Sequence, residues 1–329
     1  MINQNTVLRF EDAVWNVSGL FSHDRALLLF YDLMTECGLP VKMSVHGNIP
    51  CCWNSGRIIR SVSESYQKSC LEAYAKRNIP VFLTFSNYLI TEDQLDDTLS
   101  NRILQFTAGY PNCGAIVGSS VIGNYIRSQY PDMILSTSIL RAVHEHGRSN
   151  PDYYTKIAES YDRVVLHPDD GLDPDLIEQI LHKEKVEVLV NENCIRNCPS
   201  REEHCDLVCQ FYQNKRDQNC LEELEGFKVR KCQSVQDIKT LRRFLNGEIN
   251  TCNFTESELF AVYALGVRNF KIQGRSLSAA SLLYDITRYI LKVNYAPIIY
   301  KMMMDRIGSF VSTQDEQVLD VNFSNWERI

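Results

Sequence analysis

Long hydrophobic runs, secretion signals and common catalytic motifs are all missing from this sequence of 329 residues. No apolar run approaches the roughly 20 residues that a membrane-spanning helix needs, so we expect no membrane partner. Residues 1–10 lack the basic and apolar regions of a signal peptide, and we therefore expect a cytoplasmic protein. The absence of HExxH and GxSxG motifs argues against the common zinc proteases and serine hydrolases.

A surplus of positive charge is also missing. The chain carries 34 Lys and Arg against 41 Asp and Glu, which gives a formal net charge of -7. A general phosphate-binding surface needs clustered cations, although a local basic groove is compatible with this composition. Cysteine, by contrast, is plentiful. Twelve cysteines in a chain without a secretion signal favour thiols or metal ligands over a disulfide framework.

Short apolar runs alternate with longer segments of helical period along most of the chain. Continuous apolar strands separated by helices are typical of a parallel sheet that is buried on both faces. The pattern predicts eight strands, at residues 14–20, 41–45, 80–85, 115–118, 133–137, 162–166, 186–190 and 268–272. Helical patterns separate most of them, at residues 23–36, 59–76, 92–106, 120–129, 173–183 and 277–292. Eight such units in one α/β chain predict a (β/α)8 TIM-type barrel, with an open doubly wound sheet as the alternative.

The alternation breaks once, between residues 194 and 255. This stretch is polar, holds seven of the twelve cysteines, and is too long for a tight turn between a strand and a helix. We predict one barrel domain over residues 1–305, with this cysteine-rich loop inserted after the seventh strand, and a tail over residues 306–329. Residues 255–258, Thr-Glu-Ser-Glu, have the pattern of a capping box that opens the helix before the last strand.

In a barrel, side chains at the C-terminal ends of the strands face the active-site mouth. One set of such residues comprises the predicted substrate-binding side chains Asn54, Arg57 and Asn191. A second set comprises the predicted catalytic residues His167, Glu192, Lys271 and Arg275. We expect Arg57, Lys271 and Arg275 to hold an anionic group, and His167 or Glu192 to move protons.

The cysteines of the inserted loop carry the sharpest chemical signal. Cys194, Cys198 and Cys205 are predicted to converge on a soft metal or an iron–sulfur cluster, which usually takes four ligands. Cys232 is the predicted fourth ligand, with Cys252, Cys51 and Cys52 as alternatives. No CxxC pair occurs, so the spacing is not that of a standard zinc ribbon. Zinc with His204 as a ligand is a further alternative.

Two interpretations without a metal remain open. Cys194 follows the seventh strand, where a neighbouring His167 would lower its pKa and make it a nucleophile. In the other interpretation, the cysteines are free and partly buried thiols that fall within one loop.

Residues 266–275, Gly-Val-Arg-Asn-Phe-Lys-Ile-Gln-Gly-Arg, resemble the signature G-[VI]-x-x-[FL]-K-I-E-G-R of the collagenase-like peptidase family U-32. The stretch at 191–199 is similar to the cysteine-bearing segment that follows the seventh strand in that family. The resemblance extends over roughly residues 80–292 and implies a TIM-barrel-like fold, with Lys271 and Arg275 at the mouth. Gln273 stands where the signature has an acidic residue.

The resemblance also implies a cofactor and a class of reaction. Proteins similar to this family include oxygen-independent hydroxylation factors of quinone synthesis and RNA-modification enzymes, and several carry a [4Fe–4S] cluster on four cysteines. The leading hypothesis is therefore an iron–sulfur-dependent, oxygen-independent hydroxylation or related modification of a small-molecule or RNA-linked substrate. The alternatives are a peptidase-type hydrolase that uses Cys194 or zinc, and a non-catalytic partner subunit built on a barrel scaffold.

Overall fold

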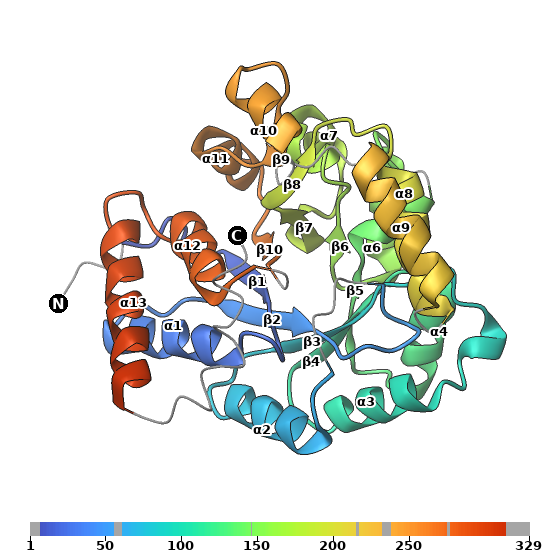
Figure 1. The fold of residues 1–329 in the computed structure, drawn as a ribbon, viewed down its shortest axis with the longest axis horizontal. Helices are drawn as coiled ribbons and strands as arrows, with labels where there is room; N and C mark the ends of the chain where they lie inside the picture. Colours follow the sequence, from blue (N-terminus) through green and yellow to red (C-terminus); the bar gives the residue numbers. More distant parts are fainter. Residues whose placement is uncertain are drawn as a thin grey trace.

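The computed structural model describes residues 7–55, 61–145, 147–214, 217–231, 238–274 and 277–313. Within these residues, eight strands form one sheet in the order β5-β4-β3-β2-β1-β10-β7-β6 (Figure 1). Every pairing between neighbouring strands is parallel. An isolated parallel bridge between Ser136 and Arg163 links β5 to β6, so the two ends of the sheet meet. The predicted (β/α)8 barrel is confirmed.

The barrel strands lie close to their predicted positions. They are β1 (Val14–Ser18), β2 (Met43–Gly47), β3 (Val81–Phe85), β4 (Cys113–Val117), β5 (Ile134–Thr137), β6 (Val164–Val165), β7 (Val186–Leu189) and β10 (Asn269–Ile272). The strand predicted over residues 162–166 is reduced to the two residues of β6.

Helices connect the strands and surround the barrel (Figure 1). They are α1 (Asp24–Glu36), α2 (Glu64–Ala75), α3 (Thr98–Ala108), α4 (Ser120–Gln129), α5 (Ile139–His144), α6 (Pro151–Ser160), α7 (Pro174–Gln179), α11 (Glu256–Ala264) and α12 (Ala279–Ile290). Most begin after a short polar side chain that accepts a hydrogen bond from a backbone N–H of the first turn. These residues are Ser63, Asp97, Ser119, Ser138, Asn150, Asp173, Thr255 and Ser278. The capping box predicted at Thr255 and Glu258 is confirmed.

Alternation along the strands separates an apolar outer face from the barrel interior. Trp15 of β1 pairs in register with Phe270 of β10, and their buried rings stack with centroids 4.9 Å apart. The next residues along, Asn16 and Lys271, are also paired in register. Because successive side chains of a strand point to opposite faces, these two polar groups lie on the other face of the sheet, inside the barrel.

Polar side chains are buried on most of the barrel strands. Branched apolar residues usually dominate the interior of such barrels, because burying a polar group costs free energy unless it is hydrogen-bonded or paired. Here the buried polar residues of the barrel strands include Asn16, Ser18, Ser44, His46, Thr84, Ser136, Glu187, Asn269 and Lys271. This concentration of buried polarity points to a functional centre within the barrel.

The stretch after β7 is folded, which corrects the prediction of a cysteine-rich loop. β8 (Asn191–Ile195) and β9 (Thr251–Asn253) form an antiparallel pair. Between them come α8 (Arg201–Gln213), α9 (Gln218–Lys231) and α10 (Ile238–Leu245). Leu207, Leu224 and Phe227 form a small core of their own between α8 and α9. The insertion is therefore a folded addition to the barrel.

The chain continues beyond α12 into α13 (Ala296–Thr313), which packs against α1 and α12. The boundary predicted between barrel and tail, at residue 305, falls inside this helix and is corrected accordingly. Residues 314–329 of the predicted tail lie outside the described residues.

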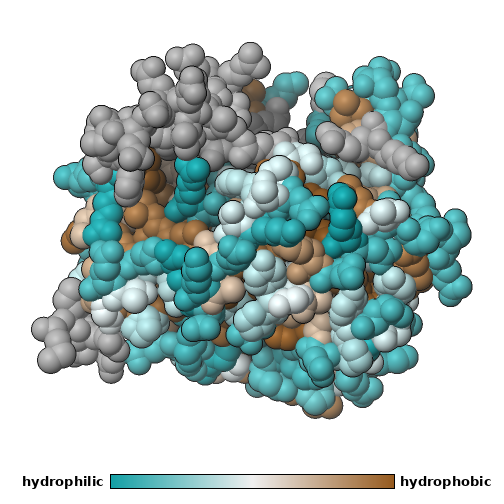
Figure 2. All heavy atoms as spheres, turned by 90° about the horizontal axis from the view of Figure 1, so that it is seen from below, coloured by the Kyte–Doolittle hydropathy of each residue, from teal (hydrophilic) through white to brown (hydrophobic). Residues whose placement is uncertain are grey.

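No helix in the described part of the chain is both long and apolar enough to cross a membrane. The face shown in Figure 2 is mostly hydrophilic, with smaller hydrophobic patches between the polar side chains.

Candidate functional site

A cavity of about 210 Å3 opens where the barrel strands end. His46, Thr84, Ile116, Leu189 and Lys271 reach it from the C-terminal halves of five barrel strands. The insertion contributes further lining residues from β8 and α8. The charged and polar part of the lining includes His46, Glu192, Arg201, His204, Lys271 and Gln273. The position agrees with the rule that active sites of such barrels lie at the C-terminal face.

Glu187 is a fully buried carboxylate at the centre of the polar interior. Its Oε1 lies 3.3 Å from Nζ of Lys271, and its Oε2 lies 3.7 Å from Nη1 of Arg163. The amide Nδ2 of Asn16 lies 3.3 and 3.2 Å from the two carboxylate oxygens and donates to them. A buried charge needs such partners, because an isolated one would cost several kcal/mol. The predicted catalytic Lys271 is thus held at the cavity wall by Glu187.

His46 lies next to this group. Its Nδ1 is 2.9 Å from Oδ1 of Asn16, and the ring is 2% exposed. Since Asn16 also binds Glu187, a chain of contacts leads from the Glu187 carboxylate through the Asn16 amide to an imidazole that lines the cavity.

Glu192, one of the predicted catalytic residues, lines the cavity. It lies on β8, and its Oε1 accepts a hydrogen bond of 3.0 Å from the backbone N–H of Cys194. One oxygen of the carboxylate is therefore fixed by the backbone, which holds the group at the wall. A carboxylate in this position is suited to accept or return a proton.

Asn191 also lines the cavity, but its side chain is hydrogen-bonded to other parts of the chain. Its Nδ2 donates to the carbonyl of Gln273 (2.7 Å) and to Oδ2 of Asp285 (2.8 Å), and its Oδ1 accepts from the N–H of Gln273 (2.8 Å). These bonds join the first residue of the insertion to the chain just after β10. Both ends of the amide are engaged within the protein, which favours a structural role over the predicted substrate contact.

Asn54 is fully buried behind the cavity wall. Its Oδ1 accepts from Oγ of Ser86 (3.2 Å) and Oγ1 of Thr84 (3.4 Å), both of which line the cavity. The structure therefore gives Asn54 the role of positioning hydroxyl groups and does not place it on the wall itself.

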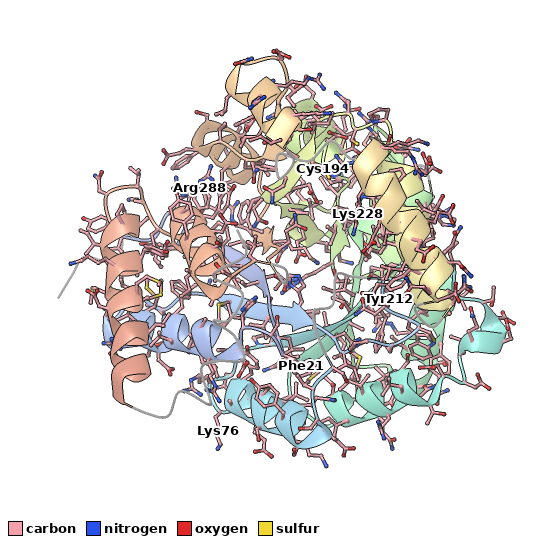
Figure 3. The ribbon with its side chains drawn as sticks, viewed as in Figure 1. Phe21, Lys76, Cys194, Tyr212, Lys228 and Arg288 are labelled. Atoms are coloured by element: carbon pink, nitrogen blue, oxygen red, sulfur yellow. The ribbon has the colours of Figure 1, made fainter. Side chains whose placement is uncertain are left out.

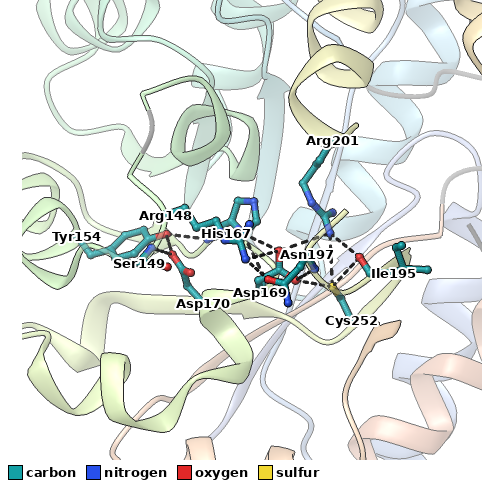
Figure 4. Close-up of polar contacts among 10 residues, drawn as sticks. All are labelled: Arg148, Ser149, Tyr154, His167, Asp169, Asp170, Ile195, Asn197, Arg201 and Cys252. Atoms are coloured by element: carbon teal, nitrogen blue, oxygen red, sulfur yellow. Dashed lines mark hydrogen bonds and ion pairs between the residues drawn. The ribbon is translucent and has the colours of Figure 1, made fainter. Parts of the chain in front are cut away.

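Arg201, the first residue of α8, contributes a second cation to the cavity. Its Nη2 donates to the carbonyl of Ile195 (3.2 Å) and to Sγ of Cys252 (3.5 Å), and lies 3.9 Å from Oδ2 of Asp169 (Figure 4). The Nε of this buried side chain has no hydrogen-bond partner among the described residues. A buried donor left in this state is unfavourable, and an acceptor group of a ligand would satisfy it.

His167 lies in the network of Figure 4 and is not among the residues that line the cavity. Its Nδ1 accepts a hydrogen bond of 3.2 Å from the backbone N–H of Asp169. Burial, followed by the charge of Arg201, lowers the pKa of His167 to about 4. The imidazole is therefore neutral at neutral pH, and its position does not support the predicted role in moving substrate protons.

Three thiols of the insertion, those of Cys194, Cys205 and Cys252, lie close enough to Arg201 to feel its charge. Cys194, shown at β8 in Figure 3, lines the cavity together with Cys205, whereas Cys198 does not line it. Burial, and then the charge of Glu192, raises the pKa of the Cys194 thiol well above its ordinary value. The prediction that His167 lowers the pKa of Cys194 is therefore wrong, because a carboxylate and a dry environment both disfavour the thiolate.

A bound cluster or zinc requires several ligands at one point. In the described ranges, no three Cys, His, Asp or Glu side chains come together in a way that could hold a metal ion. The guanidinium of Arg201 lies next to the sulfur of Cys252, where a metal ion bound to that sulfur would have to lie. The described residues alone do not fit a [4Fe–4S] cluster or a zinc site with His204, and we derive no step through either.

Three predicted site residues lie outside the described residues: Arg57, Arg275 and Cys232. The four-cysteine ligand set therefore stays a prediction. The alternative fourth ligands Cys51 and Cys52 are absent from the cavity lining, and burial raises the pKa of each to about 12.

Sequence reasoning overlooked Glu187, although the sequence carried a signal. Residues 186–190 read Val-Glu-Val-Leu-Val, a single carboxylate within an apolar strand. An apolar strand admits a charge only where a partner is at hand. Lys271 is a charged residue within the neighbouring strand β10, two residues after Asn269, the register partner of Glu187. The two charges could have been paired from the sequence once the barrel brought their strands together.

No family model matches the sequence, and no curated protein matches it. Among solved structures, the chain is similar to one entitled "The Structure of the U32 Peptidase Mk0906". The two chains are 12% identical, the TM-score is 0.49, and the similarity covers 80% of this chain and 92% of the other. At this identity and TM-score the likeness carries no argument about this chain.

Proposed function

We propose that this protein is an enzyme that binds a small anionic substrate in the cavity at the barrel mouth. The observation that carries the proposal is the pair of buried cations that line one cavity, Lys271 from the barrel and Arg201 from the insertion. A carboxylate or phosphate group between them would accept hydrogen bonds from both, including from the buried Nε of Arg201. Charge-assisted hydrogen bonds of this kind are strong where water is excluded.

The remaining lining indicates the rest of the substrate. Ile139, Leu140, Val143 and Leu277 form an apolar part of the wall, and Glu192 offers a carboxylate for proton transfer. The cavity volume of about 210 Å3 lies below the range of about 300–1,000 Å3 that holds drug-sized ligands. The substrate is therefore a small molecule with one anionic end and a short apolar body.

Titration calorimetry with malonate and with inorganic phosphate tests this proposal and distinguishes the two anion classes. We expect one of them to bind the native protein, and the Lys271→Met and Arg201→Met variants each to bind it at least about tenfold more weakly, which corresponds to about 1.4 kcal/mol. Arg148→Met is the matched control, because Arg148 also lies near Asp169 but is absent from the lining. Failure of both anions to bind, or an equal loss in the control, contradicts the proposal.

A second candidate is the iron–sulfur-dependent, oxygen-independent hydroxylation of a small or RNA-linked substrate. It is favoured by the presence of Cys194 and Cys205 on the wall of the same cavity, and it depends on a further ligand such as Cys232. Anaerobic reconstitution followed by iron and sulfide analysis tests it. About four iron atoms per chain, lost on Cys194→Ser and on Cys232→Ser, would support the cluster. Iron-free protein after reconstitution would eliminate it.

A further inference from the structure

A buried imidazole, His46, lines the same cavity as the proposed anion-binding residues Lys271 and Arg201, and the function proposed above gives it no role. We propose that His46 is the residue that takes a proton from the substrate, and that Glu187 and Asn16 are positioning residues that fix its tautomer. The role of His46 toward a substrate rests on the proposed function, whereas its tautomer does not.

The orientation of the Asn16 amide follows from Glu187. A carboxylate only accepts hydrogen bonds, so the group that Asn16 turns toward the two oxygens of Glu187, at 3.3 and 3.2 Å, is its NH2. The amide oxygen Oδ1 then faces Nδ1 of His46 at 2.9 Å. An amide oxygen also only accepts, so Nδ1 of His46 must carry the proton.

The tautomer of His46 determines which of its ring nitrogens is basic. When Nδ1 carries the proton of the neutral ring, Nε2 is the basic nitrogen. Nδ1 is directed toward Asn16, inside the barrel, and the same ring lines the cavity. Orientation of a basic imidazole by a hydrogen bond at its other nitrogen is the arrangement that general-base catalysis uses.

One carboxylate therefore organises two groups of the cavity. Glu187 binds Lys271 directly, with 3.3 Å between Oε1 and Nζ, and orients His46 through Asn16. Lys271 and His46 both line the cavity. This combination fits a substrate that carries a hydroxyl group or an acidic C–H beside its anionic group. The proton passes to Nε2, and the imidazolium that forms keeps its Nδ1–H bond to Asn16.

The tautomer can be read directly by NMR of protein labelled with 15N at histidine. Long-range 1H–15N spectra distinguish a protonated from an unprotonated ring nitrogen, and His46→Gln assigns the signals of His46 among the seven histidines. We expect the Nδ1–H form in the native protein. A Nε2–H form would overturn the inference without the need for any further variant.

Two variants test the positioning role. In Asn16→Leu the acceptor is lost, and we expect the preference for Nδ1–H to disappear. In Glu187→Gln the Asn16 amide is free to turn, and we expect a mixture of tautomers in a protein of nearly unchanged shape. If both variants fold, as judged from the amide spectrum, and keep the native tautomer, the contacts of Asn16 and Glu187 do not fix it.

Addition of malonate or inorganic phosphate separates this inference from the proposed function. We expect saturating anion to shift the Nε2 signal of His46 and to leave that of the surface residue His182 in place. Calorimetric binding that leaves His46 unmoved would exclude its contact with substrate. Absence of binding, by contrast, would contradict the proposed function, and the tautomer would still decide the positioning role of Asn16 and Glu187.

Discussion

Lys271 and Glu187 form an ion pair whose two side chains are 8% and 0% exposed, with 3.3 Å between Nζ and Oε1. The pair lies between two strands that are neighbours in the barrel, β10 and β7. Buried pairs of this kind contribute little when compared with an apolar replacement of both partners, but removal of one partner is costly.

Replacement of Lys271 by Met is expected to lower the free energy of unfolding by about 3 kcal/mol, because among the described residues it leaves the buried Glu187 with Arg163 as its one cationic partner. Urea denaturation measures the change. Lys301→Met is the matched control, since the side chain of Lys301 is 81% exposed in its pair with Asp305 and should contribute under about 1 kcal/mol. Equal effects of the two variants would show that Glu187 does not depend on Lys271.

The stability of the protein is expected to fall between pH 7 and pH 5 because of His167. Its pKa is about 4 in the folded protein against an ordinary value of 6.5, so in this range the unfolded chain binds the proton and the folded chain does not. The stability contribution is present above pH 6.5 and is lost as the pH falls toward 4, by about 2 kcal/mol at pH 5.

Urea denaturation of the native protein and of His167→Gln at pH 7 and pH 5 checks this contribution. Between pH 7 and pH 5, the free energy of unfolding of the variant should fall by about 2 kcal/mol less than that of the native protein. His182→Gln, whose side chain is 42% exposed, should behave as the native protein does. An unchanged pH dependence in His167→Gln would refute the assignment.

Cys252 is expected to resist alkylation. Burial, opposed by Arg201 and reinforced by Asp169, raises the pKa of its thiol to about 12, and only the thiolate reacts with iodoacetamide. At pH 8 the folded protein should be modified at the partly exposed Cys220 well before Cys252, and the two should react alike in urea. Mass spectrometry of peptides would show this. Equal labelling of both in the folded protein would contradict the raised pKa.

Loss of the Asn191 side-chain hydrogen bonds is expected to destabilise the protein. Asn191→Ala removes three hydrogen bonds to Gln273 and Asp285, and we expect a loss of about 2–3 kcal/mol in thermal or urea unfolding. Asn193→Ala, which removes an acceptor for Asn253 at 3.2 Å, is the control and should cost about 1 kcal/mol. Malonate or phosphate binding that fails in Asn191→Ala, with stability unchanged, would restore a substrate role to Asn191.

The barrel could be predicted from the sequence because its strands are apolar runs in a regular alternation. Strands such as residues 41–45 and 80–85 can be recognised without knowledge of their tertiary contacts, because a strand buried on both faces has few polar residues. The insertion offered no such pattern. Leu207 of α8 and Phe227 of α9 are buried against each other, and the strands β8 and β9 pair across more than fifty residues of sequence.

The candidate site was predictable in part for a similar reason. Glu192 and Lys271 follow from the rule that strand ends meet at the mouth, and both line the cavity. Arg201 does not follow a barrel strand, and only the fold of the insertion brings it there. The number of cysteines predicted metal ligands or a reactive thiol. The sequence could not show that burial raises the pKa values of Cys194 and Cys252, because the pKa of a thiol depends on the groups that surround the sulfur.

The insertion leaves the barrel at Asn191 and returns at Asn253, and these two residues are partners in the β8–β9 ladder. Everything between them begins and ends at nearly one point, so its length and sequence can change at little cost to β7 or β10. Arg201, His204 and Cys205 enter the cavity on this segment alone. Replacement of the whole segment between Asn191 and Asn253 would therefore give the same barrel a different cavity wall, and with it a different substrate preference. The ion pair between Lys271 and Glu187 would stay in place.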